Sequence, residues 1–180
     1  GHFAVYGIGA WPAIRIELGD AKAFEAMLAR VEAKVGTPAP TVTVGSLSFR
    51  EFSLEEFRVP FIIKDQELLL GFVHKNFRDE FLGYLTGSTK IASSMMADNR
   101  LLQLVKQYQF TPYGSGYIDL RSIVRQVLEA KPDSLLSRSL RATGLEIPSI
   151  PAECTSELIA MVEQSPRLIM GYKEITKRSM

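Results

Sequence analysis

The chain has 180 residues, with 21 basic and 20 acidic side chains and a formal net charge of +1. A chain of this length can bury a hydrophobic core, so it needs neither a disulfide nor a metal to fold. The balanced charge lacks the clustered Lys and Arg on which nucleic-acid binding depends, and no apolar run is long enough for a transmembrane helix. We therefore expect a globular domain with no nucleic-acid partner and no transmembrane segment.

The pattern of apolar residues predicts alternating groups of strands and helices. In chain order we expect strands over 3–8 and 14–18, a helix over 21–35, strand structure over 41–52, a hairpin over 57–74, helices over 77–85 and 99–108, a strand over 113–118, helices over 120–130, 133–144 and 152–164, and a strand over 168–172. Trp11-Pro12 is expected to interrupt the first strand, and Gly45-Ser46 to bend another. Adjacent strands separated by helices favour an α+β fold, with a mainly antiparallel sheet of about six to seven strands and helices packed on one face.

The hairpin over Phe57–His74 is the strongest of these signals. Two apolar runs flank the polar break Lys64–Glu67, and each run alternates at period two. Pro60 lies in the first run and cannot donate a ladder hydrogen bond, so it must sit at a sheet edge, at a bulge or where its amide would face away. We interpret this strand as a sheet edge that can accept a strand from a partner.

One α+β domain is expected over residues 3–180, and Gly1-His2 are interpreted as a cloning remnant. The chain starts without Met and stops just beyond an apolar run, which suggests a domain excised from a longer protein. Cys154 is the only cysteine, so an internal disulfide and a zinc site built from several cysteines are excluded.

Few residues suggest catalytic chemistry. His74 is the only histidine outside the remnant, and it is either a general base or ligand or a half-buried ring at the sheet margin. Cys154 lies in the first turn of its helix, which lowers a thiol pKa, but Glu153 and Glu157 oppose that effect. No convergent catalytic set is visible, so we assign no catalytic residue, no metal ligand and no cofactor.

Aromatic residues beside prolines are the better candidates for binding. Trp11 precedes Pro12, and Tyr113 follows Pro112. Exposed aromatics on loops are frequent anchors of protein interfaces, although such residues also cap the core at sheet ends. We therefore name Trp11, Tyr113 and His74 as candidate binding residues.

Four short motifs support a resemblance. They are Pro12-Ala13-Ile14-Arg15 followed by Asp20 and Phe24, Val59-Pro60-Phe61, Asp98-Asn99-Arg100, and Tyr117-Ile118-Asp119-Leu120. With these motifs the chain resembles modules of large exported bacterial proteins of unknown function, which are built from duplicated α+β units. The resemblance implies a periplasmic or cell-envelope location, and it implies no activity and no catalytic residue.

Three functional hypotheses follow. The leading one is a non-enzymatic binding domain of a bacterial cell-envelope or secreted protein, whose partner is another protein or another domain of the same chain. The first alternative is a hydrolase that uses Cys154 or a serine as nucleophile and His74 as base. The second is a carrier that encloses a small hydrophobic ligand between the sheet and a helix.

Overall fold

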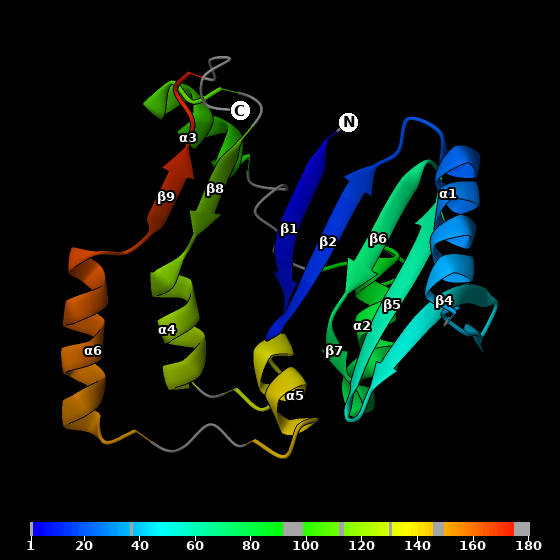
Figure 1. The fold of residues 1–180 in the computed structure, drawn as a ribbon. Coiled ribbons are helices and arrows are strands. Elements are labelled where there is room, and N and C mark those ends of the chain that lie inside the picture. Colours follow the sequence, from blue (N-terminus) through cyan, green and yellow to red (C-terminus); the bar gives the residue numbers. More distant parts are fainter. Residues whose placement is uncertain are drawn as a thin grey trace. The chain divides into compact units, whose positions relative to one another are not determined.

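The computed structural model describes residues 2–36, 38–91, 99–111, 114–129, 131–145 and 150–174 (Figure 1). The chain divides into two compact units. Unit 1 comprises Gly1–Lys90 and Leu135–Glu146, and unit 2 comprises Ile91–Ser134 and Ile147–Met180. The expectation of one domain over residues 3–180 stays a prediction, and each unit is described by itself below.

Unit 1 is built on an antiparallel sheet in the order β1-β2-β6-β5-β4-β3, with β7 paired to β5. Its strands are β1 (Phe3–Ile8), β2 (Trp11–Glu17), β3 (Thr41–Val44), β4 (Leu47–Leu54), β5 (Phe57–Lys64), β6 (Glu67–Gly71) and β7 (Val73–His74). Its helices are α1 (Ala21–Val35), the 3-10 turn η1 (Lys75–Phe77), α2 (Arg78–Leu85) and α5 (Leu135–Arg141). The predicted α+β class with a mainly antiparallel sheet is confirmed.

Hairpin turns lie beside one of the predicted interruptions and at the other. Trp11 pairs with Ile8, so Trp11 and Pro12 lie inside β2, and the turn falls at residues 9 and 10. Gly45-Ser46 joins β3 to β4 in the same way, since Val44 pairs with Leu47. The expectation that Trp11-Pro12 breaks a strand was therefore wrong, because the preceding glycine at φ +61° supplies the turn instead.

The expected hairpin is formed by β5 and β6. Its two-residue turn, Asp65-Gln66, has positive φ at both positions, as a tight hairpin turn requires. The same register continues into β7, where Phe57 faces His74. The hairpin prediction is confirmed.

Pro60 does not lie at a sheet edge, because β5 has β4 on one side and β6 and β7 on the other. Pro60 faces Glu51 of β4, and the Glu51 amide donates to the Pro40 carbonyl, away from β5. The Pro60 nitrogen therefore points to the other side, where the ladder is interrupted between β6 and β7. At this interruption the Phe72 amide donates instead to the Pro12 carbonyl of β2, at 3.2 Å. The edge interpretation was wrong, because a break in the partner ladder accommodates the missing donor.

Helices lie on both faces of the sheet, not on one face as expected (Figure 1). Phe24 of α1 stacks on Phe61 of β5, with ring centroids 6.2 Å apart. Residues next to Phe61 along the strand point to the other face, where Ile62 joins the core cluster with Phe81 of α2. Because helices cover both faces of the sheet, both faces of β5 and β6 carry apolar side chains, and their sequences are near-continuous apolar runs.

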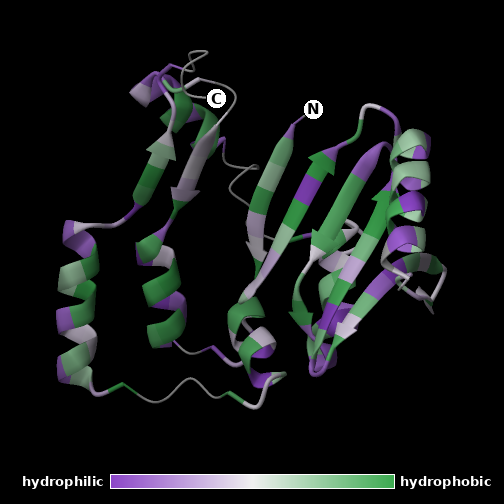
Figure 2. Cartoon of the chain, viewed as in Figure 1, coloured by the Kyte–Doolittle hydropathy of each residue, from purple (hydrophilic) through white to green (hydrophobic). Residues whose placement is uncertain are grey.

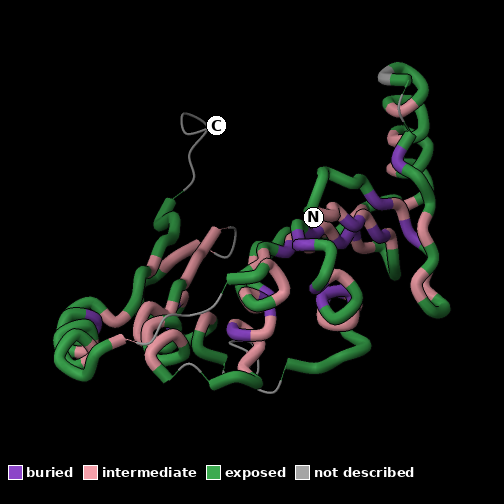
Figure 3. Tube along the Cα trace, turned by 90° about the horizontal axis from the view of Figure 1, so that it is seen from below, coloured by how far each residue is buried: buried purple, intermediate pink, exposed green. Residues whose placement is uncertain are grey.

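The main core of unit 1 lies on the α2 side of the sheet. Its buried members are Ile8, Ala13, Phe49, Ile62, Leu69, Val73, Phe77, Phe81, Leu82 and Leu85. Gly71 allows α2 to approach, since a Cβ there would lie 2.3 Å from a ring carbon of Phe81. Figure 3 shows the buried positions along the strands and this helix.

In its described part, unit 2 combines a two-stranded sheet with three helices. Its elements are α3 (Arg100–Tyr108), β8 (Ser115–Ile118), α4 (Leu120–Glu129), α6 (Ala152–Gln164) and β9 (Leu168–Gly171). The strands β8 and β9 are antiparallel. Leu104 and Val162 are its buried apolar residues in the described part of the chain, so this unit has a thin core.

Candidate functional site

Two of the three predicted binding residues belong to one ring cluster in unit 1. Trp11 lies 5.9 Å from Phe57 and 6.3 Å from Phe72, measured between ring centroids. Phe57 stacks on Phe72 at 4.8 Å and meets the His74 ring edge-on at 5.8 Å. Such pairs add about 0.5–1.5 kcal/mol each beyond burial. Tyr113 lies outside the described residues, so its role stays a prediction.

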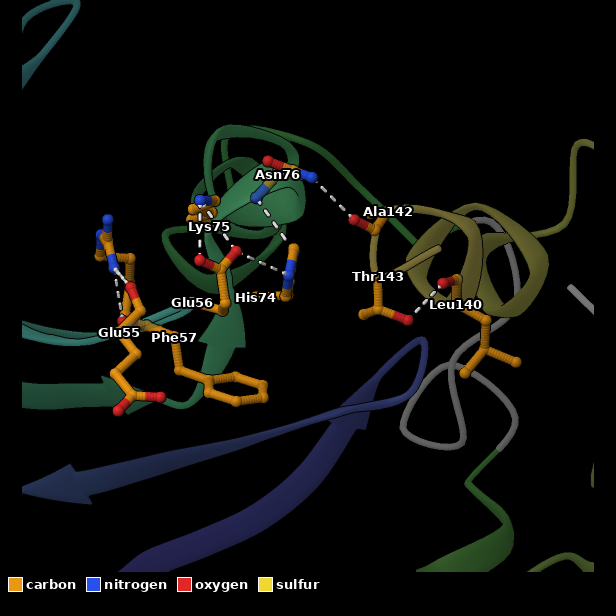
Figure 4. Close-up of polar contacts among 10 residues, drawn as sticks. Glu55, Glu56, Phe57, His74, Lys75, Asn76, Leu140, Ala142 and Thr143 are labelled. Carbon is orange, nitrogen blue, oxygen red and sulfur yellow. Dashed lines mark hydrogen bonds and ion pairs between the residues drawn. The ribbon is translucent and has the colours of Figure 1, made fainter. Parts of the chain in front are cut away.

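His74 is held in place by its own backbone surroundings (Figure 4). Its side chain is 10% exposed, and Nδ1 accepts a hydrogen bond from the Asn76 amide at 3.3 Å, which caps η1. A neutral ring in this arrangement carries its proton on Nε2. Nε2 lies 3.7 Å from a carboxylate oxygen of Glu56.

Glu56 is shared between His74 and Lys75. The Lys75 ammonium lies 2.8 Å from one carboxylate oxygen of Glu56 and donates to the other at 3.0 Å. This hydrogen bond lowers the pKa of the Glu56 carboxyl, with smaller contributions from nearby positive charge. Glu56 therefore stays ionised to lower pH than an ordinary glutamate. The polar partners of His74 in the described part of the chain are thus a backbone amide and a carboxylate, whereas a hydrolase needs a nucleophilic hydroxyl or thiol there.

Helix α5 is attached to the same end of the sheet by two hydrogen bonds. The Asn76 side-chain amide donates to the Ala142 carbonyl at 3.0 Å (Figure 4). The Ala10 amide, in the β1–β2 turn, donates to Ser139 Oγ at 2.9 Å, and Ser139 is fully buried. Both contacts link residues far apart in the sequence, and no pattern in either segment indicates the pairing.

A buried ion cluster on the α2 side was also missed at the sequence level. Glu51 is 4% exposed, and its carboxylate accepts a hydrogen bond from Arg78 Nε at 2.8 Å. Arg58 Nε lies 3.9 Å from the second oxygen, and the Arg78 guanidinium lies over the ring of Phe49, 5.7 Å from its centroid. The cluster connects the start of α2 to β4 and β5. It is a structural contact, because each charge is directed at another part of the same unit.

The most distinctive surface is the α1-side face of the sheet, defined as the face that carries Phe61. Helix α1 covers the middle of this face. The Arg50 guanidinium of β4 donates to the Glu32 carboxylate of α1 at 2.9 Å, and Leu68 of β6 is buried there. On either side of α1 apolar side chains remain in solvent, and Figure 2 shows hydrophobic residues along these strands. The exposed members are Phe3, Val5, Phe52, Leu54 and Phe72.

Cys154 lies on α6 in unit 2 and is exposed as a free thiol. In the described ranges no group of three or more His, Cys, Asp or Glu side chains is arranged to hold a metal ion. None of the described helices combines the length and the apolarity of a membrane span.

No family model, no curated protein and no solved structure matches the chain. The resemblance to modules of exported bacterial proteins therefore stays a prediction.

Proposed function

We propose that this chain is a non-enzymatic interaction domain, and that unit 1 binds another protein, or another domain of a longer protein, through its α1-side face. The observation that carries this proposal is the apolar exposure on both sides of α1. Leu54 is 54% exposed and Phe52 39% exposed, although both lie on a regular strand. Contiguous exposed apolar surface of this kind marks interaction sites in folded proteins.

Covering this face has a favourable free energy. Full burial of a Leu or Phe side chain contributes about 1.5–3 kcal/mol, and roughly half of that remains to be gained at Leu54 and Phe52. A partner that covers both would gain about 2 kcal/mol from these two residues before the costs of association. Phe72, which is 36% exposed on this face, belongs to the ring cluster with Phe57 and Trp11, and aromatic side chains of this kind supply anchoring area at interfaces.

The surroundings of His74 also favour binding over catalysis. A general base must present an unprotonated nitrogen to the group that it deprotonates. Nδ1 of His74 already accepts a hydrogen bond from the Asn76 amide. Nε2, which carries the proton of a neutral ring in this arrangement, lies 3.7 Å from the Glu56 carboxylate. We further propose, from the resemblance described above, that the parent protein is a bacterial cell-envelope or secreted protein.

Site-specific photo-crosslinking tests the binding proposal. A benzophenone amino acid at Leu54 is compared with the same amino acid at Ser53, which is exposed and points to the opposite face of β4. We expect a discrete protein adduct in cells of the source organism from position 54 and not from position 53. The adduct should disappear when Phe52→Lys is added.

A hydrolase screen tests the competing hypothesis. The purified chain is assayed against ester, peptide and glycoside substrates, together with His74→Ala and Cys154→Ser. We expect no turnover by any of the three proteins. Turnover that His74→Ala abolishes, combined with no adduct from position 54, would replace the interaction hypothesis with an enzymatic one.

A further inference from the structure

Strand β1 is a free edge of the unit 1 sheet, because β2 is its single neighbour among the described strands. Its six residues, FAVYGI, include no charged residue and no proline. Sheet edges are normally protected by charges, prolines or bulges, since unpaired backbone groups attract other strands. The opposite edge, β3, is shorter and directly follows two prolines. Strand β1 therefore stands out as the unprotected edge.

The register decides which backbone groups face outward. The Glu17 amide donates to the His2 carbonyl, so residue 2 of the edge points its backbone groups toward β2. In an antiparallel ladder these groups alternate, and the amides and carbonyls of Phe3, Val5 and Gly7 consequently face away from β2. Gly7 pairs with Pro12, which has no amide to donate, in agreement with this assignment.

The side chains of these three residues form a simple size pattern. Phe3 is 70% exposed and Val5 64% exposed, whereas Gly7 has no side chain. A Cβ on Gly7 would meet its nearest neighbour, the Gly9 carbonyl, at an ordinary 3.6 Å, so there is open space above this glycine. Side-chain size therefore decreases along one face of the edge strand, from Phe3 through Val5 to Gly7.

We propose that β1 pairs antiparallel with β1 of a second copy of this chain, with the two-fold axis at Val5. In this register Val5 faces Val5 of the partner subunit, and Phe3 faces Gly7 of the partner subunit. The three outward residues then form three hydrogen-bonded pairs with two bonds each. Each Phe3 ring lies over a glycine that leaves space for it, an arrangement known to stabilise glycines at strand edges.

The self-complementary pattern favours a second copy over an unrelated strand. An antiparallel second copy presents the same residues in the reverse order, Gly7, Val5 and Phe3. The large side chain of each strand therefore lies opposite the glycine of the other. The edge contains no charged side chain, and the chain carries a net charge of only +1, so two copies do not repel each other strongly. Contacts between two edge strands bury less than the roughly 1,200 Å² of a standard interface, and we therefore expect a concentration-dependent dimer.

This inference goes beyond the proposed function, because it uses the backbone edge of the sheet and a second copy instead of a different protein. Sedimentation equilibrium over a wide concentration range tests it. The wild-type chain should form a reversible dimer, and Val5→Lys, which places two like charges at the axis, should weaken association at least tenfold. The control Val31→Lys makes the same change on α1 at a side chain that is 49% exposed, and it should dimerise as the wild type does.

Disulfide trapping tests the register in a Cys154→Ser background. Hydrogen-bonded antiparallel pairs have Cα atoms about 5.5 Å apart, within the range that a disulfide spans. Oxidised Val5→Cys should therefore give a covalent dimer. Ala4→Cys, exposed on the other face of the same strand, should give little. A wild-type chain that stays monomeric at all concentrations, or equal trapping at both positions, would overturn the inference and leave the crosslinking result from Leu54 unaffected.

Discussion

Substituting Gly9 by alanine tests whether α5 docks on the β1–β2 turn. Gly9 has φ +61°, and a Cβ there would lie 2.5 Å from Ser139 Oγ and 2.9 Å from the Leu135 carbonyl. Gly36, which ends α1, is the matched control, because it has φ +75° and its Cβ would meet nothing within 4 Å. Both substitutions force alanine into the left-handed region, and only Gly9→Ala also collides with α5.

The two costs can be separated. A left-handed alanine costs about 1–2 kcal/mol, and the reduced freedom of the unfolded chain returns about 0.5 kcal/mol, so Gly36→Ala should lower the free energy of unfolding by about 1 kcal/mol. Gly9→Ala adds overpacking of about 1–3 kcal/mol and about 1 kcal/mol for the bond between the Ala10 amide and Ser139. We expect a total of about 3–5 kcal/mol.

Urea unfolding followed by tryptophan fluorescence measures this difference. Trp11 is the only tryptophan and lies beside the turn in unit 1, so the signal reports this unit. Similar slopes with urea for both variants would show that the unfolding transition is unchanged. If Gly9→Ala cost no more than Gly36→Ala, the docking of α5 on the turn would be refuted.

Two further predictions concern charged groups of unit 1. Glu51→Ala removes the carboxylate that pairs with Arg78 at 2.8 Å, and it leaves the exposed Asp79 carboxylate, 3.5 Å away, as the remaining ion-pair partner of this mostly buried guanidinium in the described part of the chain. The free energy of unfolding in urea should fall by about 3 kcal/mol. A loss below about 1 kcal/mol would show that the Glu51–Arg78 pair behaves like a surface salt bridge. The hydrogen bond from Lys75 lowers the pKa of the Glu56 carboxyl in the folded chain. The pair therefore stabilises the fold above the pKa that Glu56 has in the unfolded chain, about 4.3. This stabilisation is lost as the pH falls through the pKa of Glu56 in the folded chain. An NMR titration should give a lower pKa for Glu56 in the wild type than in Lys75→Ala, and equal values would contradict the contact.

Local signals in the sequence were sufficient to locate the elements. Asp20 accepts from the Ala23 amide at 3.0 Å as the cap of α1, and the Asp65-Gln66 turn fixes the β5–β6 register. These features depend on residues within a few positions of each other. The order of strands in the sheet depends instead on contacts between residues far apart in the sequence. Pro60 suggested an edge because a proline cannot donate in a ladder, but a neighbouring strand interrupted at one residue accommodates it in the interior.

The candidate site was predictable to a similar extent. With the hairpin register fixed, the pairing of Phe57 with His74 follows by counting, and it brings Glu56 close to the histidine. Trp11 was selected as an aromatic beside a proline, but its contacts with Phe57 and Phe72 require the pairing of β2 with β6. That pairing is set by burial of the whole sheet and has no local signal.

The strand order also has a consequence for how unit 1 folds. Strands β3, β4 and β5 each pair with the next strand in sequence, whereas β2 pairs with β6 across the whole segment from Glu17 to Glu67. Closing that long loop costs more chain entropy than forming any of the hairpins. We infer that the meander forms first and that docking of β1 and β2 completes the sheet. Pulsed hydrogen exchange should then protect the Ile62 amide before the Ile14 amide, and the reverse order would contradict this sequence of events.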